Sequence, residues 1–274
     1  GGIGAASRLG ILFKGGNFLD VMTKINVIVM DKTGTMTKGV FKVQKVVPNN
    51  IDEKELVKLT AALEKNSTHP IAKAVTEYAG DITNNIKVEG VEEISGHGLK
   101  GKVDGKEMLA GNVKLLKKFN ITYPAEIENI ADTIVVVAIN NQYAGYITMG
   151  DEIKEDAVQA VKDMHSLNIK TVMLSGDKQS VVDEVAKAVG IDEAYGDLLP
   201  EGKVDKVQQL KNAGKSIAFV GDGVNDAPVV ALADAGIAMG GLGSDATIET
   251  ADVVIQNDQP HKIVSAIRIG KITR

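Results

Sequence analysis

The sequence predicts an α/β protein whose parallel sheet carries an inserted α+β domain with an antiparallel sheet. After residue 150, short apolar runs alternate with helical patterns, which is typical of βαβ units. Residues 40–146 instead contain hairpin signals between apolar runs. The apolar run 25–30 precedes this segment and needs a neighbouring strand, so we expect both ends of the sequence to form one sheet.

Composition and charge restrict the class of protein. The chain has 274 residues, 44% hydrophobic and 24% charged, which is ordinary for a globular protein. A net charge of −5 argues against a nucleic-acid partner, and the lack of cysteine excludes disulfides and thiolate metal sites. No apolar run reaches the roughly 18 residues that a membrane span needs. The sequence begins without Met and ends within a helical pattern, so we expect a piece of a longer protein.

The first elements follow from local patterns. Residues 1–20 suggest a helix with a turn at Gly15 and Gly16, followed by a short amphipathic segment. The apolar run 25–30 is the first strand. Residues 52–65 place apolar side chains at helical spacing behind an aspartate cap. A second helix is expected near Pro70, because proline is favoured in a first helical turn.

Later elements are predicted in the same way. Asp104–Gly105 and Asn140–Asn141 are turn signals between strand-like runs and predict two hairpins. The helices expected after the inserted segment are 153–166, 178–189, 201–213 and one at the carboxyl end. The strands expected between them lie in the runs K-T-V-M-L, S-I-A-F-V, A-G-I-A-M and A-D-V-V-I.

Carboxylates follow three of these strands. Asp31, Asp177 and Asp222 each come at the end of an apolar run, and Asp226 lies four residues further on. Sites in open α/β sheets form at the carboxyl ends of the strands, and converging carboxylates suit Mg²⁺ and therefore phosphate. Lys203 can add a fixed positive charge. Glycines that let backbone N–H groups approach an anion are Gly34, Gly176, Gly221 and Gly223. One such aspartate alone is usually a helix cap or a solvated loop residue, but the whole set favours a site.

Four stretches carry a family resemblance. D-K-T-G-T-M-T (31–37) and G-D-G-V-N-D-A-P (221–228) resemble the signature motifs of P-type ATPases, with S-G-D (175–177) and P-E-G-K (200–203) in the expected order between them. Those ion pumps belong to the haloacid-dehalogenase-like superfamily. The resemblance covers essentially the whole chain. It implies a haloacid-dehalogenase-like phosphorylation domain with an inserted nucleotide-binding domain.

The resemblance also implies roles for individual residues. Asp31 would accept the γ-phosphoryl group of ATP, while Lys203 and the Ser175 hydroxyl hold phosphate oxygens. Mg²⁺ would be bound by Asp31, by the Thr33 backbone carbonyl and by Asp222, with Asp226 in support. The catalytic residues expected are Asp31, Thr33, Ser175, Gly176, Asp177, Lys203 and Asp226.

Position 33 separates a pump from a phosphatase. Phosphatases of this superfamily usually carry an aspartate two residues after the nucleophile as general acid and base. Thr33 stands there and cannot do that work, so the resemblance implies an aspartyl phosphate that persists. A stand-alone phosphatase with a cap domain remains an alternative, as does a nucleotide-sensing module without catalysis.

The inserted segment points to a subfamily. Glu64, N-S-T-H-P (66–70), G-H-G (96–98) and G-N (111–112) resemble the nucleotide motifs of heavy-metal-transporting (type IB) P-type ATPases. The residues that would surround adenine and ribose are Glu64, His69, Gly96, Gly98, Gly111 and Asn112. Taken singly, His-Pro can be only a helix start and G-x-G only a bulge. The three other histidines, His97, His165 and His261, match no motif and suggest no metal site.

The opening segment looks closest to the zinc, cadmium and lead branch, although copper and cobalt pumps are similar there. The resemblance implies a stalk at 1–20 and 263–274, a phosphorylation domain at 21–39 and 147–262, and a nucleotide-binding domain at 40–146. Transmembrane and actuator domains of the same polypeptide would be its partners. The whole protein would lie in the cell membrane with this segment on the cytoplasmic side, and the segment alone would be soluble and weakly active at most.

Overall fold

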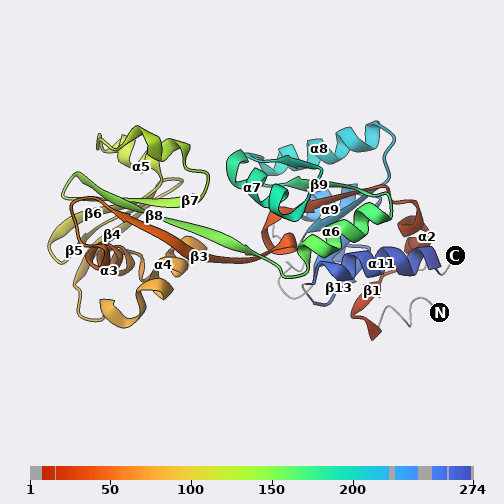
Figure 1. The fold of residues 1–274 in the computed structure, drawn as a ribbon, viewed down its shortest axis with the longest axis horizontal. Coiled ribbons are helices and arrows are strands. Elements are labelled where there is room, and N and C mark those ends of the chain that lie inside the picture. Colours follow the sequence, from red (N-terminus) through yellow and green to blue (C-terminus); the bar gives the residue numbers. More distant parts are fainter. Residues whose placement is uncertain (1–7, 16, 222–225, 240–248, 258, 273–274) are drawn as a thin grey trace. The chain divides into compact units, whose positions relative to one another are not determined.

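A computed structural model describes residues 8–15, 17–221, 226–239, 249–257 and 259–272. The chain divides into two compact units (Figure 1). Unit 1 comprises Gly1–Gly39 and Ile153–Arg274, and unit 2 comprises Val40–Glu152. Both ends of the sequence therefore build one unit, and the middle of the sequence builds the other.

Unit 1 contains a seven-stranded sheet in the order β1-β13-β12-β11-β2-β9-β10, parallel except for β1. The strands are β1 (Ile11–Phe13), β2 (Val27–Asp31), β9 (Lys170–Leu174), β10 (Glu193–Tyr195), β11 (Ile217–Gly221), β12 (Ala235–Met239) and β13 (Val253–Ile255). Strands β2 and β11 lie at the centre, so β2 is buried over its whole length. The predicted parallel sheet is confirmed.

Helices cover both faces of this sheet (Figure 1). They are α2 (Asn17–Lys24), α6 (Ala157–Ser166), α7 (Gln179–Val189), α8 (Pro200–Asn212), α9 (Ala227–Leu232) and α11 (His261–Ile272). In β2, Ile28 and Met30 pack on the face covered by α2, α6, α7 and α11, while Val27 and Val29 face α8 and α9. A strand buried on both faces has to be apolar throughout, which is why V-I-V-M shows no alternation.

The expected helix within residues 1–20 is wrong for residues 11–13. These residues form β1, which pairs antiparallel with β13 through Ile11–Ile255 and Phe13–Val253. Ile11 and Phe13 are buried and Leu12 is exposed, so the period is two rather than 3.6. The short amphipathic segment that follows is the helix α2. The sequence pattern also missed β10, a three-residue strand at the opposite edge of the sheet.

Unit 2 contains a six-stranded sheet in the order β3-β8-β7-β6-β5-β4. Its strands are β3 (Thr37–Pro48), β4 (Val88–Ile94), β5 (Gly98–Val103), β6 (Lys106–Gly111), β7 (Thr133–Ile139) and β8 (Gln142–Ile153). Its helices are α3 (Glu53–Glu64), α4 (Pro70–Ala79), α5 (Val113–Lys118) and the short 3₁₀ turns η2 (Gly80–Thr83) and η3 (Ala125–Asn129). Helices α3 and α4 pack on one face, and α5 packs on the other.

Local signals explain why these elements begin and end where they do. The Asp52 carboxylate accepts hydrogen bonds from the backbone N–H groups of Lys54 and Glu55 at 3.1 and 3.3 Å, which caps α3. Both predicted hairpins are confirmed. Asp104 has φ of 52° and Asn140 has φ of 49°, the left-handed geometry that two-residue hairpin turns require.

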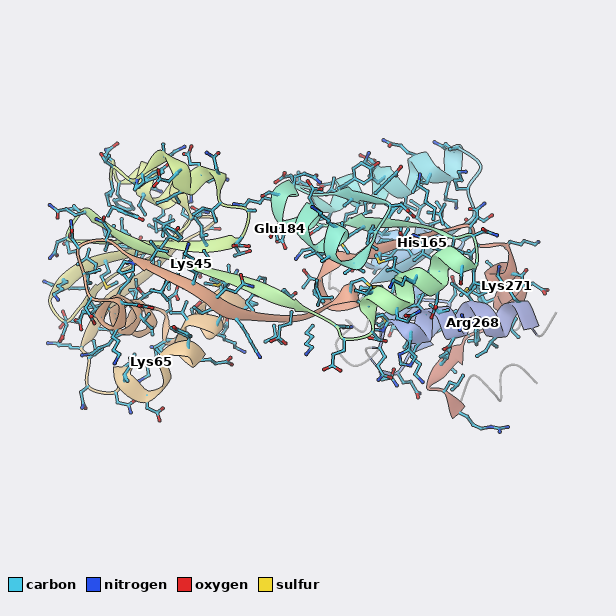
Figure 2. The ribbon with its side chains drawn as sticks, viewed as in Figure 1. Lys45, Lys65, His165, Glu184, Arg268 and Lys271 are labelled. Atoms are coloured by element: carbon cyan, nitrogen blue, oxygen red, sulfur yellow. The ribbon has the colours of Figure 1, made fainter. Side chains whose placement is uncertain are left out.

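The division into units differs from the expected one in two places. Strand β8 runs without a break from Gln142 to Ile153, so the second boundary falls at 152/153 rather than after residue 146. Helix α11 belongs to unit 1, because Ile263, Val264 and Ile267 are buried in its core. Arg268 and Lys271 lie on this helix (Figure 2). No helix in the described ranges is long and apolar enough to cross a bilayer.

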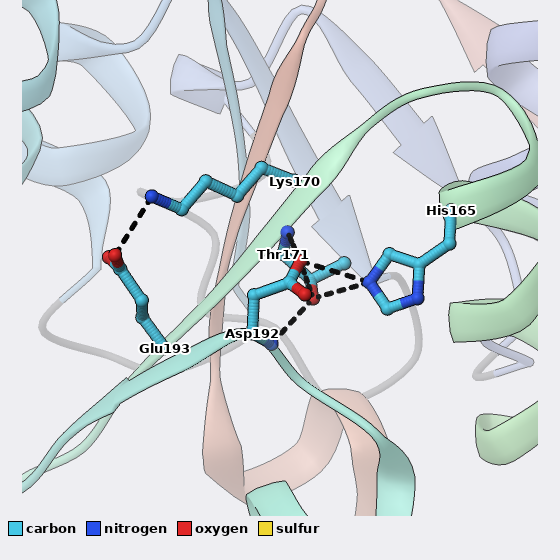
Figure 3. Close-up of polar contacts among 5 residues, drawn as sticks. All are labelled: His165, Lys170, Thr171, Asp192 and Glu193. Atoms are coloured by element: carbon cyan, nitrogen blue, oxygen red, sulfur yellow. Dashed lines mark hydrogen bonds and ion pairs between the residues drawn. The ribbon is translucent and has the colours of Figure 1, made fainter.

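A polar network joins α6, β9 and β10 near the amino-terminal ends of these two strands of unit 1 (Figure 3). One Asp192 carboxylate oxygen accepts hydrogen bonds from the Thr171 backbone N–H at 2.8 Å and the Thr171 hydroxyl at 3.1 Å, and pairs with His165 Nε2 at 2.9 Å. Lys170 and Glu193 form an ion pair at 2.8 Å beside them. The network therefore lies at the opposite end of the strands from their carboxyl ends.

Candidate functional site

Two buried aspartates and a lysine meet at the carboxyl end of β2. Asp31 is the last residue of that strand, and Asp226 lies directly before α9. Lys203, in the first turn of α8, places its Nζ 3.1 Å from Asp31 Oδ1 and 3.6 Å from Asp226 Oδ1. A Cβ at Gly221 would lie 2.6 Å from Asp226 Oδ2, so only glycine admits this carboxylate. The structure thus brings together three of the predicted site residues.

The environment changes the acidity of this group. Burial, followed by the negative charge of Asp226, raises the pKa of Asp31 to about 8, against the opposing effect of Lys203. Burial also acts to lower the pKa of Lys203, but the charges of Asp31 and Asp226 outweigh it and raise that pKa. Among the described residues at this point, two carboxylates share one ammonium group. When both carboxylates are ionised, the excess negative charge suits a divalent cation.

The turn after Asp31 is held by side chains from its own end and from the end of β8. Gly34 has φ of 82°, which glycine adopts without strain. The Thr37 hydroxyl donates to the Lys32 carbonyl at 3.1 Å, and its oxygen accepts from the Gly34 backbone N–H at 3.4 Å. Lys154 is buried, and its Nζ donates to the Gly34 carbonyl at 2.8 Å. Thr33 keeps an exposed side chain at the tip of this turn.

The S-G-D stretch follows β9, which lies next to β2. Ser175 is buried, and its hydroxyl oxygen accepts the Asp177 backbone N–H at 3.0 Å. The hydroxyl hydrogen of Ser175 therefore stays available to donate to an anion. Asp177 is partly exposed and pairs with Lys32 Nζ at 2.8 Å. Gly176 lies between them, and a Cβ there would approach the Leu198 carbonyl oxygen to 3.3 Å.

Two predicted residues of this site, Asp222 and Gly223, lie outside the described residues. Among those described, no group of three or more His, Cys, Asp or Glu side chains is placed to hold a metal. Asp31 and Asp226 are the two carboxylates that the structure brings together here.

Unit 2 contains a cavity of about 300 Å³ between the ends of α3, α4 and the β5–β6 hairpin. All six residues predicted to surround a nucleotide line it: Glu64, His69, Gly96, Gly98, Gly111 and Asn112. Apolar side chains complete the lining, among them Ile71, Leu99 and Ile134. A mainly apolar cavity with a few polar groups is the usual form of a small-molecule site.

His69 serves as a helix cap and also lines the cavity. Its Nδ1 accepts the Ile71 backbone N–H at 3.2 Å at the start of α4. Because Nδ1 is the acceptor, the neutral ring carries its proton on Nε2, which can donate to a ligand. Both the oxygen and the nitrogen of the Asn112 side chain make a hydrogen bond within the protein. Its side chain accepts the Leu115 N–H at 3.2 Å and donates to the Gly96 carbonyl at 2.8 Å.

The glycines of the cavity have different reasons to be glycine. Gly98 and Gly111 lie opposite each other on β5 and β6. A Cβ on Gly98 would lie 2.4 Å from the Ala110 carbonyl oxygen, and one on Gly111 would lie 2.1 Å from the His97 carbonyl oxygen. These two glycines therefore let the strands approach each other. Gly96 has φ of 75° and open space around it, so its conformation is what requires glycine.

Comparison with known proteins places the chain in a family. The model of haloacid dehalogenase-like hydrolases matches residues 25–234. The chain belongs to the haloacid dehalogenase-like hydrolase family. A "Zinc-transporting ATPase" of Synechocystis is 50% identical over 279 residues, covering 100% of this chain and 38% of that protein. A "Cadmium, zinc and cobalt-transporting ATPase" of Bacillus subtilis is 48% identical, covering 100% of this chain and 40% of that protein.

Solved structures agree with the sequence comparison. A crystal structure of a zinc-transporting PIB-type ATPase in the E2.Pi state matches with a TM-score of 0.83 and 34% identity, over 99% of this chain and 45% of that one. A copper-exporting P-type ATPase of Staphylococcus epidermidis is more distant, at 37% sequence identity. Within the haloacid dehalogenase-like hydrolases, the chain thus matches the catalytic region of P-type ATPases of the heavy-metal class, and the resemblance stated above is confirmed. The chain spans about two fifths of the length of the Synechocystis and Bacillus subtilis relatives.

Two lysines of this haloacid dehalogenase-like hydrolase were not predicted as site residues. Lys32 is 1% exposed and holds Asp177, and Lys154 is 8% exposed and holds the Gly34 carbonyl. Lysine is almost never buried without a partner, so their burial indicates that these two lysines hold the surrounding backbone and side chains in place. The sequence offered one signal for Lys32, which stands directly after Asp31 between a buried strand and a glycine turn. Lys154 offered none, because it lies in a charged run with Asp151, Glu152 and Glu155.

Proposed function

We propose that the chain binds ATP in the unit 2 cavity and transfers the γ-phosphoryl group of ATP to Asp31. The observation that carries the proposal is the contact of Lys203 with both Asp31 and Asp226 at the end of β2. A lysine held within 3.1 Å of the attacking carboxylate can neutralise charge on the transferred group. The exposed hydroxyl of Thr33, rather than a carboxylate, stands where a phosphatase needs its acid and base.

The reaction of the ionised Asp31 carboxylate requires no proton transfer. A carboxylate oxygen of Asp31 forms a bond to the γ-phosphorus, and the bond from that phosphorus to the β–γ bridging oxygen breaks, so ADP leaves with the electron pair. Lys203 stabilises the charge on the phosphoryl oxygens, and the Ser175 hydroxyl donates to one of them. Mg²⁺, held by Asp31, the Thr33 carbonyl and Asp222 with Asp226 in support, would supply positive charge that favours ionised Asp31.

The whole protein would use this step to transport a heavy-metal cation across a membrane, with actuator and transmembrane domains as partners of this segment on the cytoplasmic side. Its relatives named above transport zinc, cadmium or cobalt, and the higher identity to them than to the copper exporter supports zinc or cadmium as the transported ion. Zinc- or cadmium-stimulated ATPase activity of the full-length protein, without copper stimulation, would test this part.

The phosphoryl transfer is tested on the chain itself. The chain is incubated with Mg²⁺ and γ-labelled ATP, quenched in acid, and mapped by peptide mass spectrometry. We expect an acid-stable, hydroxylamine-sensitive phosphate on Asp31 that is lost in Asp31→Asn. Rapid hydrolysis of p-nitrophenyl phosphate without such an adduct would instead establish a phosphatase. ATP binding without adduct or hydrolysis, in both the isolated chain and the full-length protein, would leave a nucleotide-sensing module.

A further inference from the structure

Glu64 is a buried acid without a partner among the described residues. It is the last residue of α3, only 5% of its surface is exposed, and it lines the cavity of unit 2. Its Oε2 atom has no hydrogen-bond partner among the described residues. Buried carboxylates are normally paired or hydrogen-bonded, so an unpaired one beside a cavity indicates a group kept for a ligand.

The surroundings supply no positive charge to keep this acid ionised. The other titratable residues that line the cavity are His69, Glu93 and His97, and no lysine or arginine is among the described lining residues. His69 Nδ1 is occupied by the Ile71 N–H, and His97 Nδ1 contacts the Ser95 carbonyl oxygen at 2.9 Å. Burial raises the pKa of Glu64 to about 8.

Charged residues on the neighbouring elements point elsewhere. Lys100 of β5 lies over the Phe119 ring on the face of the sheet that α5 covers, and Lys102 shares that face by strand alternation. Lys106 lies at the far end of β6 from the cavity. The charged residues Lys65, Lys73 and Asp81, on or next to α3, α4 and η2, are exposed.

We propose that Glu64 binds the adenine base of the nucleotide as a neutral carboxylic acid, and that ATP affinity therefore falls as pH rises and Glu64 ionises. This inference rests on the nucleotide site proposed above. An adenine edge presents an amino donor beside a ring-nitrogen acceptor. A neutral acid matches that edge, because its carbonyl oxygen accepts from the amino group while its O–H donates to the ring nitrogen. An ionised carboxylate has only acceptors and would face the ring-nitrogen lone pair.

The test uses ADP binding to the whole chain by titration calorimetry, without Mg²⁺, between pH 7.5 and 9.5. If only the neutral acid binds, wild-type affinity should fall on the order of 20-fold over this range, since each pH unit above the pKa removes about tenfold. Binding at pH 9 should take up close to one proton, measured in buffers of different ionisation enthalpy. Glu64→Gln, which keeps a donor and an acceptor without charge, should bind ADP with no such slope and no such uptake.

Controls separate this inference from the proposed nucleotide site. Glu92→Gln changes an exposed acid on the same strand as Glu93 and should keep the wild-type slope. A wild-type affinity that is flat to pH 9.5, or a slope that Glu64→Gln retains, would overturn the neutral acid. Loss of ADP binding in a folded Glu64→Gln protein would show that the charge is needed, with the same consequence. If wild type binds no ADP at pH 7.5, the nucleotide site itself is wrong.

Discussion

Each unit contains a buried acid whose pKa is raised to about 8, but the two acids differ in their surroundings. Asp31 in unit 1 lies among charges, with Lys203 at 3.1 Å and Asp226 beside it. Glu64 in unit 2 has no charged partner among the residues that the structure describes, and burial alone raises its pKa. Asp31 therefore stands where added positive charge can ionise it, whereas Glu64 stands where neutrality is the low-energy state. The first suits a nucleophile and the second a hydrogen-bonding group.

The largest expected effect comes from removing the charge beside Asp31. Lys203→Met keeps an unbranched apolar stem but leaves Asp31 and Asp226 without their shared ammonium group. We expect phosphorylation of Asp31 to fall about 10³-fold, since a fixed donor at the transferred group is worth that much. Acid-quench labelling measures it. Lys206→Met, one turn further along α8, removes a lysine that lies over the Tyr195 ring and should leave labelling unchanged. Equal labelling of Lys203→Met and wild type would remove Lys203 from the reaction.

In unit 1, the sequence predicted the residues of the charged site around Asp31 more completely than the lysines that hold its turn in place. Asp31 ends a buried strand and Lys203 lies in the first turn of a helix, and such positions can be found from apolar runs and turn residues. Lys154 could not be found this way, because its burial depends on where the chain re-enters unit 1 after β8. Tertiary placement decides whether a lysine is solvated or buried, and one sequence does not contain it.

The same limit applies to the fold. The hairpins of unit 2 were predicted because Asp-Gly and Asn-Asn turns have a local conformational cause. Strand β1 was not, since I-L-F is too short to show a period and becomes a strand only by pairing with β13. The uncharged site showed the same split. Glu64 entered through a resemblance, while its burial and its missing partner became visible only in the structure.

A second prediction concerns the shape of the uncharged cavity. In Gly98→Ala the new methyl group would meet the Ala110 carbonyl oxygen, so we expect unit 2 to lose about 3 kcal/mol of stability and its nucleotide affinity. Gly96→Ala has open space and only an unfavourable φ, so it should cost about 1 kcal/mol. Hydrogen exchange of α3 and β5 peptides, together with ADP titration, measures both. A Gly98→Ala protein as stable as Gly96→Ala would contradict the close strand approach.

A third prediction tests neutrality through stability. The folded pKa of Glu64 lies above its unfolded value. The contribution of Glu64 to the stability of unit 2 is therefore fully present below about pH 4.5 and is lost as pH rises through about 8. Stability of unit 2 should therefore fall by on the order of 1 kcal/mol per pH unit between those values. Glu64→Gln should remove this slope and stabilise unit 2 at pH 8. Hydrogen exchange of α3 peptides at several pH values gives the answer, and parallel profiles for the two proteins would contradict it.

The smallest effect is expected at Asp192, a third acid, whose pKa is shifted in the opposite direction. Burial acts to raise its pKa, but hydrogen bonds from Thr171 and then His165 outweigh burial and lower that pKa (Figure 3). The contribution of Asp192 to the stability of unit 1 is therefore present above its unfolded pKa and lost as pH falls through its folded pKa. This pH dependence is opposite in sign to that of Glu64. Asp192→Asn should cost unit 1 about 1 kcal/mol in urea unfolding at pH 7.

Phosphorylation at Asp31 should distinguish substitutions at Asp192 and Asp31, although both residues belong to the unit 1 sheet region. Asp192 lies at the edge where β10 begins, so Asp192→Asn should label at Asp31 as well as wild type, whereas Asp31→Asn should not label at all. A buried acid without compensating partners destabilises its unit and is retained for chemistry or binding, while an acid that accepts several hydrogen bonds stabilises its unit. Loss of labelling in a folded Asp192→Asn protein would show that the two edges of the sheet are coupled and that this distinction fails.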